Sequence, residues 1–327
     1  MPNSSHPIGI FILGDVSPKD IVSLSRQVEN SGFSELWFAE DYFMLSGFSS
    51  AAIALQATNS INVGVGAVSS VVRHPAVTAM EASTLAGAYP GRFTLGIGHG
   101  VPAWTKQMYL YPKSVLTAMR ESVTSVKRLL NGETLTETGE YFSFNEVTLT
   151  HPAPELQLLT AVVGPRSIDL TAEIADGIMV SVLGGPKYVQ MVSDRLKSQR
   201  PDRETSFRLV TYALTSVGRD GESARKQIRP ATAFYLNAMG PTLITEAYGA
   251  NDALSEILNE GGQAALEEKL QDDWLNWLTV SGNPDECTHA INNLFSAGST
   301  SVVLCIAPSE QLPEQLELIA EEMLPNL

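Results

Sequence analysis

The sequence predicts an α/β protein with a (β/α)8 TIM barrel, and three observations support this fold class. Short apolar runs of strand length alternate with amphipathic helical segments along the chain of 327 residues. The alternation gives eight strand–helix units, and no long polar linker separates them. Eight units favour a closed parallel barrel over an open doubly wound sheet, which usually carries a nucleotide-binding loop after its first strand; Gly14-Asp15 is not such a loop. We therefore expect residues 1–327 to form a single domain.

The first four units follow from residue 8 onward. Residues 8–13 form a nearly continuous apolar run, which is typical of a parallel strand buried on both faces. Ser17-Pro18 predicts the start of the next helix and Ser31-Gly32 its end, because proline suits the first helical turn and glycine the position after the last. Further strands are expected at 35–39, 61–68 and 92–98, and further helices at 75–88 and 114–130.

The second half repeats the pattern and adds two excursions. The turn residues Thr138-Gly139 inside an alternating segment predict a hairpin near residues 134–149. The helical segment 221–278 is longer than one unit needs, so we expect a helical insertion near residues 235–278, with breaks at Gly240-Pro241 and Gly261-Gly262. The remaining strands are expected at 156–163, 177–182, 207–217 and 300–306, and the remaining helices at 167–175, 186–197, 284–295 and 309–322.

Composition narrows the function classes. The formal net charge of −15 repels nucleic acid and anionic membranes, so we expect neither as a partner and expect a small organic substrate instead. The two cysteines, Cys287 and Cys305, exclude a disulfide framework and a four-thiolate metal cluster, and no histidine or carboxylate pair has metal-site spacing, so we predict no metal. The apolar run after residue 7 is too short to span a membrane and lacks a basic flank, which, with the cysteine usage, predicts a cytoplasmic protein.

Reactive residues of such a barrel lie at the carboxyl ends of its strands. The turn after the fifth strand, Gly164-Pro165-Arg166-Ser167, places a glycine, a cation and a hydroxyl before a helix. Backbone N–H groups, the guanidinium and the hydroxyl could converge there on one phosphate. The pair Gly184-Gly185 before the next helix would lie beside it. The alternative is that Ser167 only caps the helix and that the glycines only form tight turns.

Two glycines, Gly64 and Gly66, lie inside the third strand. Glycine weakens a strand unless something must approach the backbone closely, and a flat ring lying against the strand would be such a group. A β-bulge or a close helix contact is the alternative.

Polar candidates follow the second and fourth strands. Glu40, Asp41 and Tyr42 could position a substrate or transfer a proton, whereas a carboxylate in this position could also cap a helix. His99 lies between two glycines and is the candidate for a near-neutral pKa, with a hydrogen bond inside its own loop as the alternative. We expect His74, which precedes a proline at a helix start, to be structural.

Five motifs occur in order along the chain: GAVSSVVRHP at 66–75, GRFTLGIG at 91–98, GET with GEYF at 132–142, GPRS at 164–167 with ADG at 175–177, and SGNPDE at 281–286. In this order they resemble luciferase-like monooxygenase-superfamily proteins. The likeness is greatest to the branch that uses coenzyme F420, such as methylenetetrahydromethanopterin reductase and F420-dependent glucose-6-phosphate dehydrogenase. The resemblance runs from about residue 8 to the C-terminus.

The resemblance implies a bacterial-luciferase-like barrel that holds a flavin or deazaflavin ring at its mouth, in a homodimer. It implies a non-prolyl cis peptide bond at Gly66–Ala67, a phosphate site at 164–167 and an acidic residue, Asp41, near the ring. The catalytic residues that we expect are Asp41, Tyr42 and His99. The expected cofactor-binding residues are Gly66, Ala67, Val68, Gly98, Gly164, Pro165, Arg166, Ser167, Gly184 and Gly185.

Two departures from the sugar-phosphate dehydrogenase pattern bear on the substrate. That pattern has Asp-His where this chain has Asp41-Tyr42, and a glutamate where it has Val101, so we do not expect glucose 6-phosphate. We expect hydride transfer between coenzyme F420 and another small organic substrate. The alternatives are an FMN-dependent luciferase-like monooxygenase and a catalytically silent binding homologue. A partly hydrophobic substrate is suggested by four apolar residues expected near the mouth: Phe43, Phe48, Trp104 and Tyr109.

Overall fold

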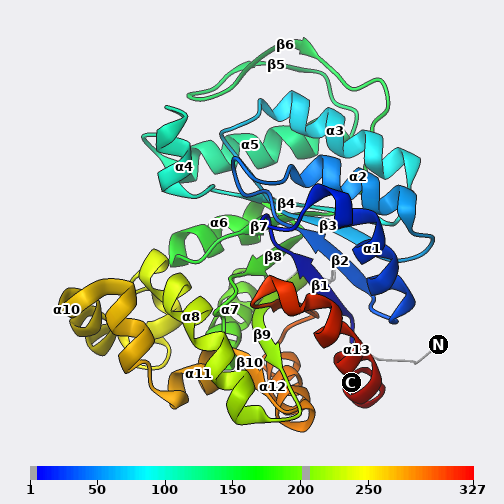
Figure 1. Ribbon diagram of the computed structural model, residues 1–327. Helices are drawn as coiled ribbons and strands as arrows, with labels where there is room; N and C mark the ends of the chain where they lie inside the picture. Colours follow the sequence, from blue (N-terminus) through cyan, green and yellow to red (C-terminus); the bar gives the residue numbers. More distant parts are fainter. Residues whose placement is uncertain (1–5, 201–206) are drawn as a thin grey trace.

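Eight parallel strands close into a barrel in the computed structural model, which describes residues 6–200 and 207–327 (Figure 1). The hydrogen-bonded order runs β1, β2, β3, β4, β7, β8, β9 and β11, and β11 pairs back with β1, so the predicted barrel is confirmed. The bounds of these strands are β1 Ile8–Ile12, β2 Glu35–Phe38, β3 Asn62–Ser69, β4 Phe93–Gly98, β7 Leu158–Ala161, β8 Gly177–Val180, β9 Arg208–Val217 and β11 Ser301–Ile306.

Helices surround the barrel and cover the outer face of the strands (Figure 1). The helices in the predicted segments begin and end within a few residues of the expected limits: α1 Ile21–Asn30, α3 Pro75–Ala88, α5 Val115–Leu130, α6 Pro165–Ile174, α7 Pro186–Gln199, α8 Gly221–Met239, α12 Pro284–Ser296 and α13 Leu312–Glu322. Short 3₁₀ turns, η1 Pro18–Asp20 and η2 Ser309–Gln311, precede α1 and α13, and a third, η3 Leu324–Asn326, ends the chain.

Three elements were not predicted. The helix α2, Gly47–Ala57, consists largely of small and apolar residues, so its sequence has little of the polar–apolar periodicity that marks a surface helix. The Ser46 side chain caps it by accepting from the Ser49 backbone N–H at 3.5 Å. The helix α4, Pro102–Gln107, and the strand β10, Val280–Gly282, are too short to give a periodic signal. The strand β10 pairs with β9 outside the ring.

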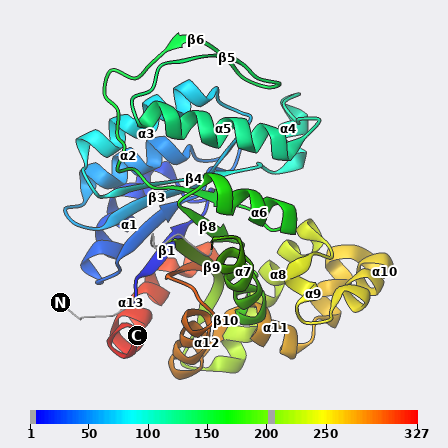
Figure 2. The same cartoon turned by 180° about the vertical axis from the view of Figure 1, so that it is seen from behind.

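Two excursions leave the barrel (Figures 1 and 2). The antiparallel strands β5, Leu135–Thr138, and β6, Ser143–Val147, arch over α3 and α5. The Glu121 carboxylate of α5 anchors the turn, because it accepts backbone N–H bonds from Glu140, Tyr141 and Phe142 at 2.8–3.1 Å. The second excursion contains α9 Leu243–Glu246, α10 Asn251–Lys269 and α11 Asp272–Leu278, and α10 is kinked at Gly261 and Gly262.

Large side chains fill the barrel interior and come to lie against its glycines. A side chain on Gly64 would collide with the Trp37 indole, and one on Gly66 would collide with the Tyr212 hydroxyl and the Met179 methyl group. These contacts give both glycines a packing reason within the protein itself. The register of β3 against β4 also shifts between Val65 and Val68, which agrees with the bulge considered from the sequence.

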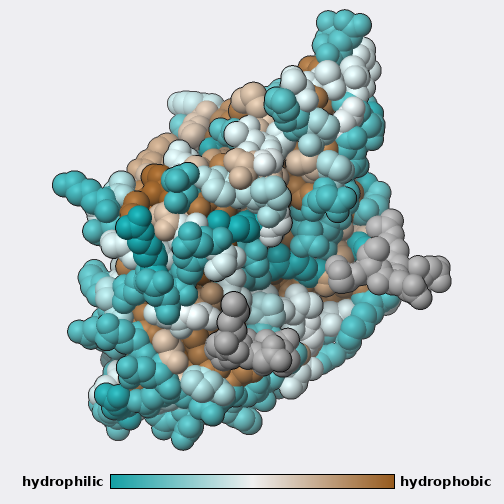
Figure 3. Space-filling view, turned by 90° about the vertical axis from the view of Figure 1, so that its right-hand side faces the viewer, coloured by the Kyte–Doolittle hydropathy of each residue, from teal (hydrophilic) through white to brown (hydrophobic). Residues whose placement is uncertain are grey.

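The face of the molecule shown in Figure 3 is mainly hydrophilic, in keeping with the net charge of −15. No helix in residues 6–200 or 207–327 combines the length and apolar character that crossing a membrane requires.

A buried ion pair closes the amino-terminal end of the barrel. The Glu35 carboxylate accepts hydrogen bonds from the Arg208 guanidinium at 2.6 Å, the Trp37 indole N–H at 2.8 Å and the Ser301 hydroxyl at 2.9 Å. Glu35 is buried, and these donors come from three different strands, β2, β9 and β11. Residues at this end of a TM-type α/β barrel stabilise the fold and do not carry the chemistry.

We predict that Glu35→Ala lowers the free energy of unfolding by about 3–5 kcal/mol, because it leaves the Arg208 charge without its buried partner. The matched control is Glu222→Ala, which removes an exposed ion pair with Lys226 at 3.0 Å and should change stability by less than about 0.5 kcal/mol. Urea unfolding of both variants measures the difference, and equal effects would contradict the role given to Glu35.

Candidate active site

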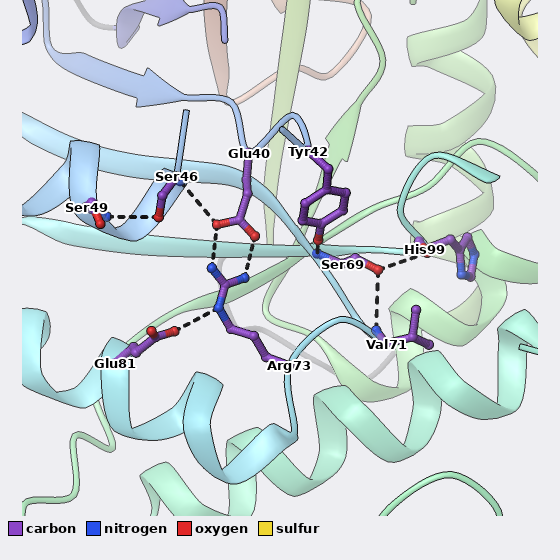
Figure 4. A network of polar contacts seen from close by, with 10 residues as sticks. Glu40, Tyr42, Ser46, Ser49, Ser69, Val71, Arg73, Glu81 and His99 are labelled. Atoms are coloured by element: carbon purple, nitrogen blue, oxygen red, sulfur yellow. Dashed lines mark hydrogen bonds and ion pairs between the residues drawn. The ribbon is translucent and has the colours of Figure 1, made fainter. Parts of the chain in front are cut away.

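A chain of hydrogen bonds links the carboxyl ends of β2, β3 and β4 at the mouth of the barrel (Figure 4). The Tyr42 hydroxyl accepts the Ser69 backbone N–H at 3.2 Å, and the Ser69 hydroxyl donates to the His99 carbonyl oxygen at 3.3 Å. Burial, and then the negative charge of Glu40, raise the pKa of Tyr42 to about 12. The phenol is therefore neutral at physiological pH, and two of the predicted catalytic residues, Tyr42 and His99, are brought together through Ser69.

The His99 ring joins the end of β4 to the first turn of α6. Its Nε2 atom lies 3.0 Å from the Ser167 hydroxyl oxygen. Burial lowers the pKa of His99, and the Val115 backbone carbonyl opposes this only in part, so the imidazole is neutral near pH 7. Gly164, not Ser167, is the N-cap of α6, so the alternative that Ser167 only caps this helix is wrong.

Asp41 lies beside Gly14 and Asp15, where the first and second strands end. Burial raises the pKa of the Asp41 carboxyl, and the negative charges of Asp15 and Glu40 raise it further, against one hydrogen bond from the Gly14 backbone. Asp15 accepts a hydrogen bond from the Ser309 hydroxyl at 2.9 Å. A carboxyl group that retains its proton to a higher pH is suited to donate a proton at this mouth.

Because the pKa of Asp41 is raised, we predict that the difference in the free energy of unfolding between the wild type and Asp41→Asn depends on pH. The unfolded aspartate ionises from about pH 4, whereas the folded one ionises later, so the wild type loses stability relative to the variant as the pH rises through that interval. Asp220→Asn is the control with the opposite sign, since a hydrogen bond from Ser223 lowers the pKa of Asp220. Urea unfolding between pH 3 and 8 measures both, and parallel curves for Asp41→Asn and wild type would refute the assignment.

Glu40 has a structural role, as its sequence position allowed. Its carboxylate forms a bidentate ion pair with Arg73, one bond of which is 2.8 Å, and it accepts the Gly47 backbone N–H at 3.2 Å at the start of α2 (Figure 4). Arg73 also pairs with Glu81 at 3.1 Å. His74 is structural too, because its Nδ1 atom caps α3 by accepting the Ala76 backbone N–H at 3.2 Å.

The floor of the mouth is lined by small residues. A Cβ atom on Gly98 would lie 3.4 Å from the Ala161 Cβ and 3.6 Å from the Ala67 Cβ. Both alanines are partly exposed, while Val68 is buried. The Gly66–Ala67 peptide bond is cis, as the resemblance implies. This floor on β3, β4 and β7 therefore presents small side chains and no large one.

The two glycine turns differ in their surroundings. A Cβ on Gly185 would overlap the Trp277 carbonyl, and the Tyr248 hydroxyl accepts the Lys187 backbone N–H at 3.2 Å at the start of α7. The helical insertion therefore packs on the turn at Gly184 and Gly185. In contrast, Gly164 has no atom within 4 Å of its Cβ position, and no side chain caps α6.

Arg166 is exposed and lines a groove between α5 and α6 with a cavity volume of about 630 Å³. In residues 6–200 and 207–327 it has no hydrogen-bond or ion-pair partner, whereas Arg120 in the same groove pairs with Glu173. Pro165 begins α6 and is also exposed.

Two residues of α8, Tyr235 and Met239, were missed from the sequence, whereas Ser181 follows the sixth barrel strand as expected. Tyr235 of α8 lies near Asp15, Asp41 and Cys305, and burial is the main cause that raises its pKa. Ser181 at the end of β8 lies 3.6 Å from the Met239 sulfur of the same helix. Site residues were expected directly after the strands, and nothing in the sequence of α8 indicates that its side chains reach the mouth. Phe48, expected there, is instead buried against Phe93 and Arg73.

The Tyr212 hydroxyl is buried in the barrel beside Gly66 and has no hydrogen-bond partner in the described ranges 6–200 and 207–327. We predict that Tyr212→Phe leaves the free energy of unfolding unchanged or raises it by about 1 kcal/mol, because an unpaired buried hydroxyl is destabilising. The control, Tyr188→Phe, removes a bond to the Val163 carbonyl at 2.8 Å and should lower stability by about 1 kcal/mol. A destabilised Tyr212→Phe protein would reveal a partner for that hydroxyl.

Comparison with known proteins agrees with this arrangement. The model of the luciferase-like monooxygenase family matches residues 6–301. The chain belongs to this family. It is 26% identical to 5,10-methylenetetrahydromethanopterin reductase of Archaeoglobus fulgidus, covering 98% of this chain and 99% of that one. It is also 26% identical to the F420-dependent glucose-6-phosphate dehydrogenase of Nakamurella multipartita, with coverage of 95% of this chain and 93% of that one.

Solved structures of the same fold include the coenzyme F420 dependent tetrahydromethanopterin reductase of Methanopyrus kandleri, with a TM-score of 0.85, 23% identity and coverage of 98% and 99%. These relatives confirm the expected resemblance to F420-dependent oxidoreductases. The chain is therefore a TIM barrel that belongs to a family of oxidoreductases.

Proposed function

We propose that this protein transfers a hydride between coenzyme F420 and a small organic substrate at the barrel mouth. The observation that carries the proposal is the likeness to F420-dependent reductases and dehydrogenases over nearly the full length of the chain and of those relatives. When bound, the deazaflavin supplies the hydride chemistry, and the barrel supplies orientation and a pocket from which water is excluded.

The residues at the mouth fit a flat anionic cofactor. In the proposal, the small floor formed by Gly66, Ala67, Gly98 and Ala161, with Val68 behind it, would receive the ring. The uncapped start of α6, from Gly164 through Pro165 and Arg166 to Ser167, would receive the phosphate, because free N–H groups and the positive helix end favour an anion. Gly184 and Gly185 would border this site through their turn rather than bind the phosphate, since the insertion occupies the start of α7.

Asp41, Tyr42 and His99 have distinct roles in the proposal. Asp41, whose carboxyl pKa is raised by burial, is the proton donor to the substrate in this proposal. The neutral Tyr42 phenol and the neutral His99 ring fix the loops around it, and His99 orients the Ser167 hydroxyl at 3.0 Å toward the phosphate end. We further propose a homodimer in the cytoplasm; the two cysteines are free and buried, in keeping with a reducing compartment.

A second candidate function is an FMN-dependent monooxygenase. It is favoured by a structural neighbour of the same fold, a type II Baeyer-Villiger monooxygenase of Pseudomonas putida in complex with FMN, with a TM-score of 0.70 and 16% identity. Parallel titrations of the protein with F420 and with FMN distinguish the two cofactors. Tight binding of FMN alone would replace the proposal with the monooxygenase, and failure to bind either would favour a silent binding homologue.

We predict that Arg166→Ala weakens F420 binding about tenfold or more, because a charge-assisted bond to the phosphate is lost. Arg120→Ala is the control, since it removes a cation from the same groove whose charge is already paired with Glu173. Fluorescence titration of F420 measures both affinities. Equal affinities for the two variants would withdraw Arg166 from the phosphate site.

A further inference from the structure

Exposed apolar side chains gather on two loops at the mouth. Twelve large apolar side chains are exposed in residues 6–200 and 207–327, and six of them lie on the loops after β2 and β4. We call these six the rim; they are Phe43, Met44, Val101, Tyr109, Leu110 and Tyr111. Single exposed apolar residues are ordinary, but a cluster around an opening marks a binding surface.

The two loops of the rim border one opening. The Tyr42 and Trp104 rings, one from each loop, meet edge to face with centroids 6.2 Å apart. The strands β2 and β4 flank β3, so both loops leave the barrel on either side of Ser69 (Figure 4). Asp41 and His99 stand at the base of the same loops. The rim therefore borders the candidate catalytic residues on the side of these two loops.

The backbone conformation singles out two members of the rim. Phe43 has a φ angle of 72° and Tyr109 a φ angle of 60°, in the left-handed region that aromatic residues rarely adopt. The side chains of Phe43 and Tyr109 are 71% and 96% exposed. Packing on the protein thus gives no reason for an aromatic residue at either position. Unfavourable backbone conformations of this kind concentrate at ligand clamps.

We propose that Phe43 and Tyr109 form an aromatic clamp that binds the apolar body of the substrate while its reacting group lies near Asp41. This inference rests on the proposed function and deepens it, because it assigns the substrate to hydrophobic ring compounds rather than to sugar phosphates. A second copy of the chain on the rim would close the approach to Asp41 and His99, which a substrate must use. The occupant is therefore a small molecule.

The test compares two probes of different apolar size, cyclohexanone and 2-decalone. Ligand-observed NMR measures their dissociation constants with the F420-loaded protein and with the protein alone. We expect 2-decalone to bind at least about tenfold more tightly, because its additional carbons are removed from water. In Phe43→Asn/Tyr109→Asn, this preference should fall below about threefold, since asparagine accepts the left-handed backbone but removes the aromatic surface.

The control variant is Val77→Thr/Met80→Gln, which changes exposed apolar residues of α3 that do not belong to the rim and should keep the wild-type preference. If the double asparagine variant fails to fold, Tyr109→Asn alone replaces it, because that side chain is almost fully exposed. An unchanged preference in the rim variant overturns the clamp, and a loss of mass in sedimentation with unchanged preference assigns the rim to self-association instead. Absence of F420 binding would defeat the proposed function, while the probe preference of the protein alone would still decide the clamp.

Discussion

The barrel depends on how large side chains from facing strands fill its interior. Trp37 on the neighbouring strand β2 packs over Gly64, and Tyr212 of β9 and Met179 of β8 reach across the barrel to Gly66. Next to this packed layer lie the small residues Ala67, Gly98 and Ala161, of which the two alanines are partly exposed, so large side chains give way to small ones toward the mouth. One strand with glycine at alternate positions therefore separates the part of the molecule that confers stability from the part that can accept a ligand.

The charged groups at the amino-terminal end of the barrel differ in their role from those at the mouth. At the amino-terminal end, Glu35 and Arg208 satisfy each other inside the barrel and are unavailable for chemistry. At the mouth, the buried Glu40 is neutralised by Arg73, whereas the half-buried Asp41 has no cationic partner among the described residues and its pKa is raised. Adjacent carboxylates at the end of β2 thus have different tasks because only one of them has a cationic partner.

The strands and most helices could be predicted from the sequence because apolar runs and capping residues are local signals. The helix α2 could not, because its uniformly small and apolar residues carry no periodic face. Among the site residues, His99 and Asp41 were found from their position after strands, and their neighbours Ser167 and Asp15 define their environment. The packing of Gly185 on Trp277 and the approach of Tyr235 to the mouth depend on contacts between distant segments, which no local pattern contains.

The contacts that hold the β5–β6 hairpin on α5 also connect this hairpin to the mouth of the barrel. Glu121 fixes the turn between β5 and β6, and the Tyr141 hydroxyl in that turn accepts the Ser114 backbone N–H at 2.7 Å, where α5 begins. The backbone of the next residue, Val115, lies close enough to the His99 ring to raise its pKa against the effect of burial. The β5–β6 hairpin is thereby connected to the His99 imidazole through the start of α5. Shortening the hairpin would therefore remove a structural support of the barrel mouth as well as a segment of the surface.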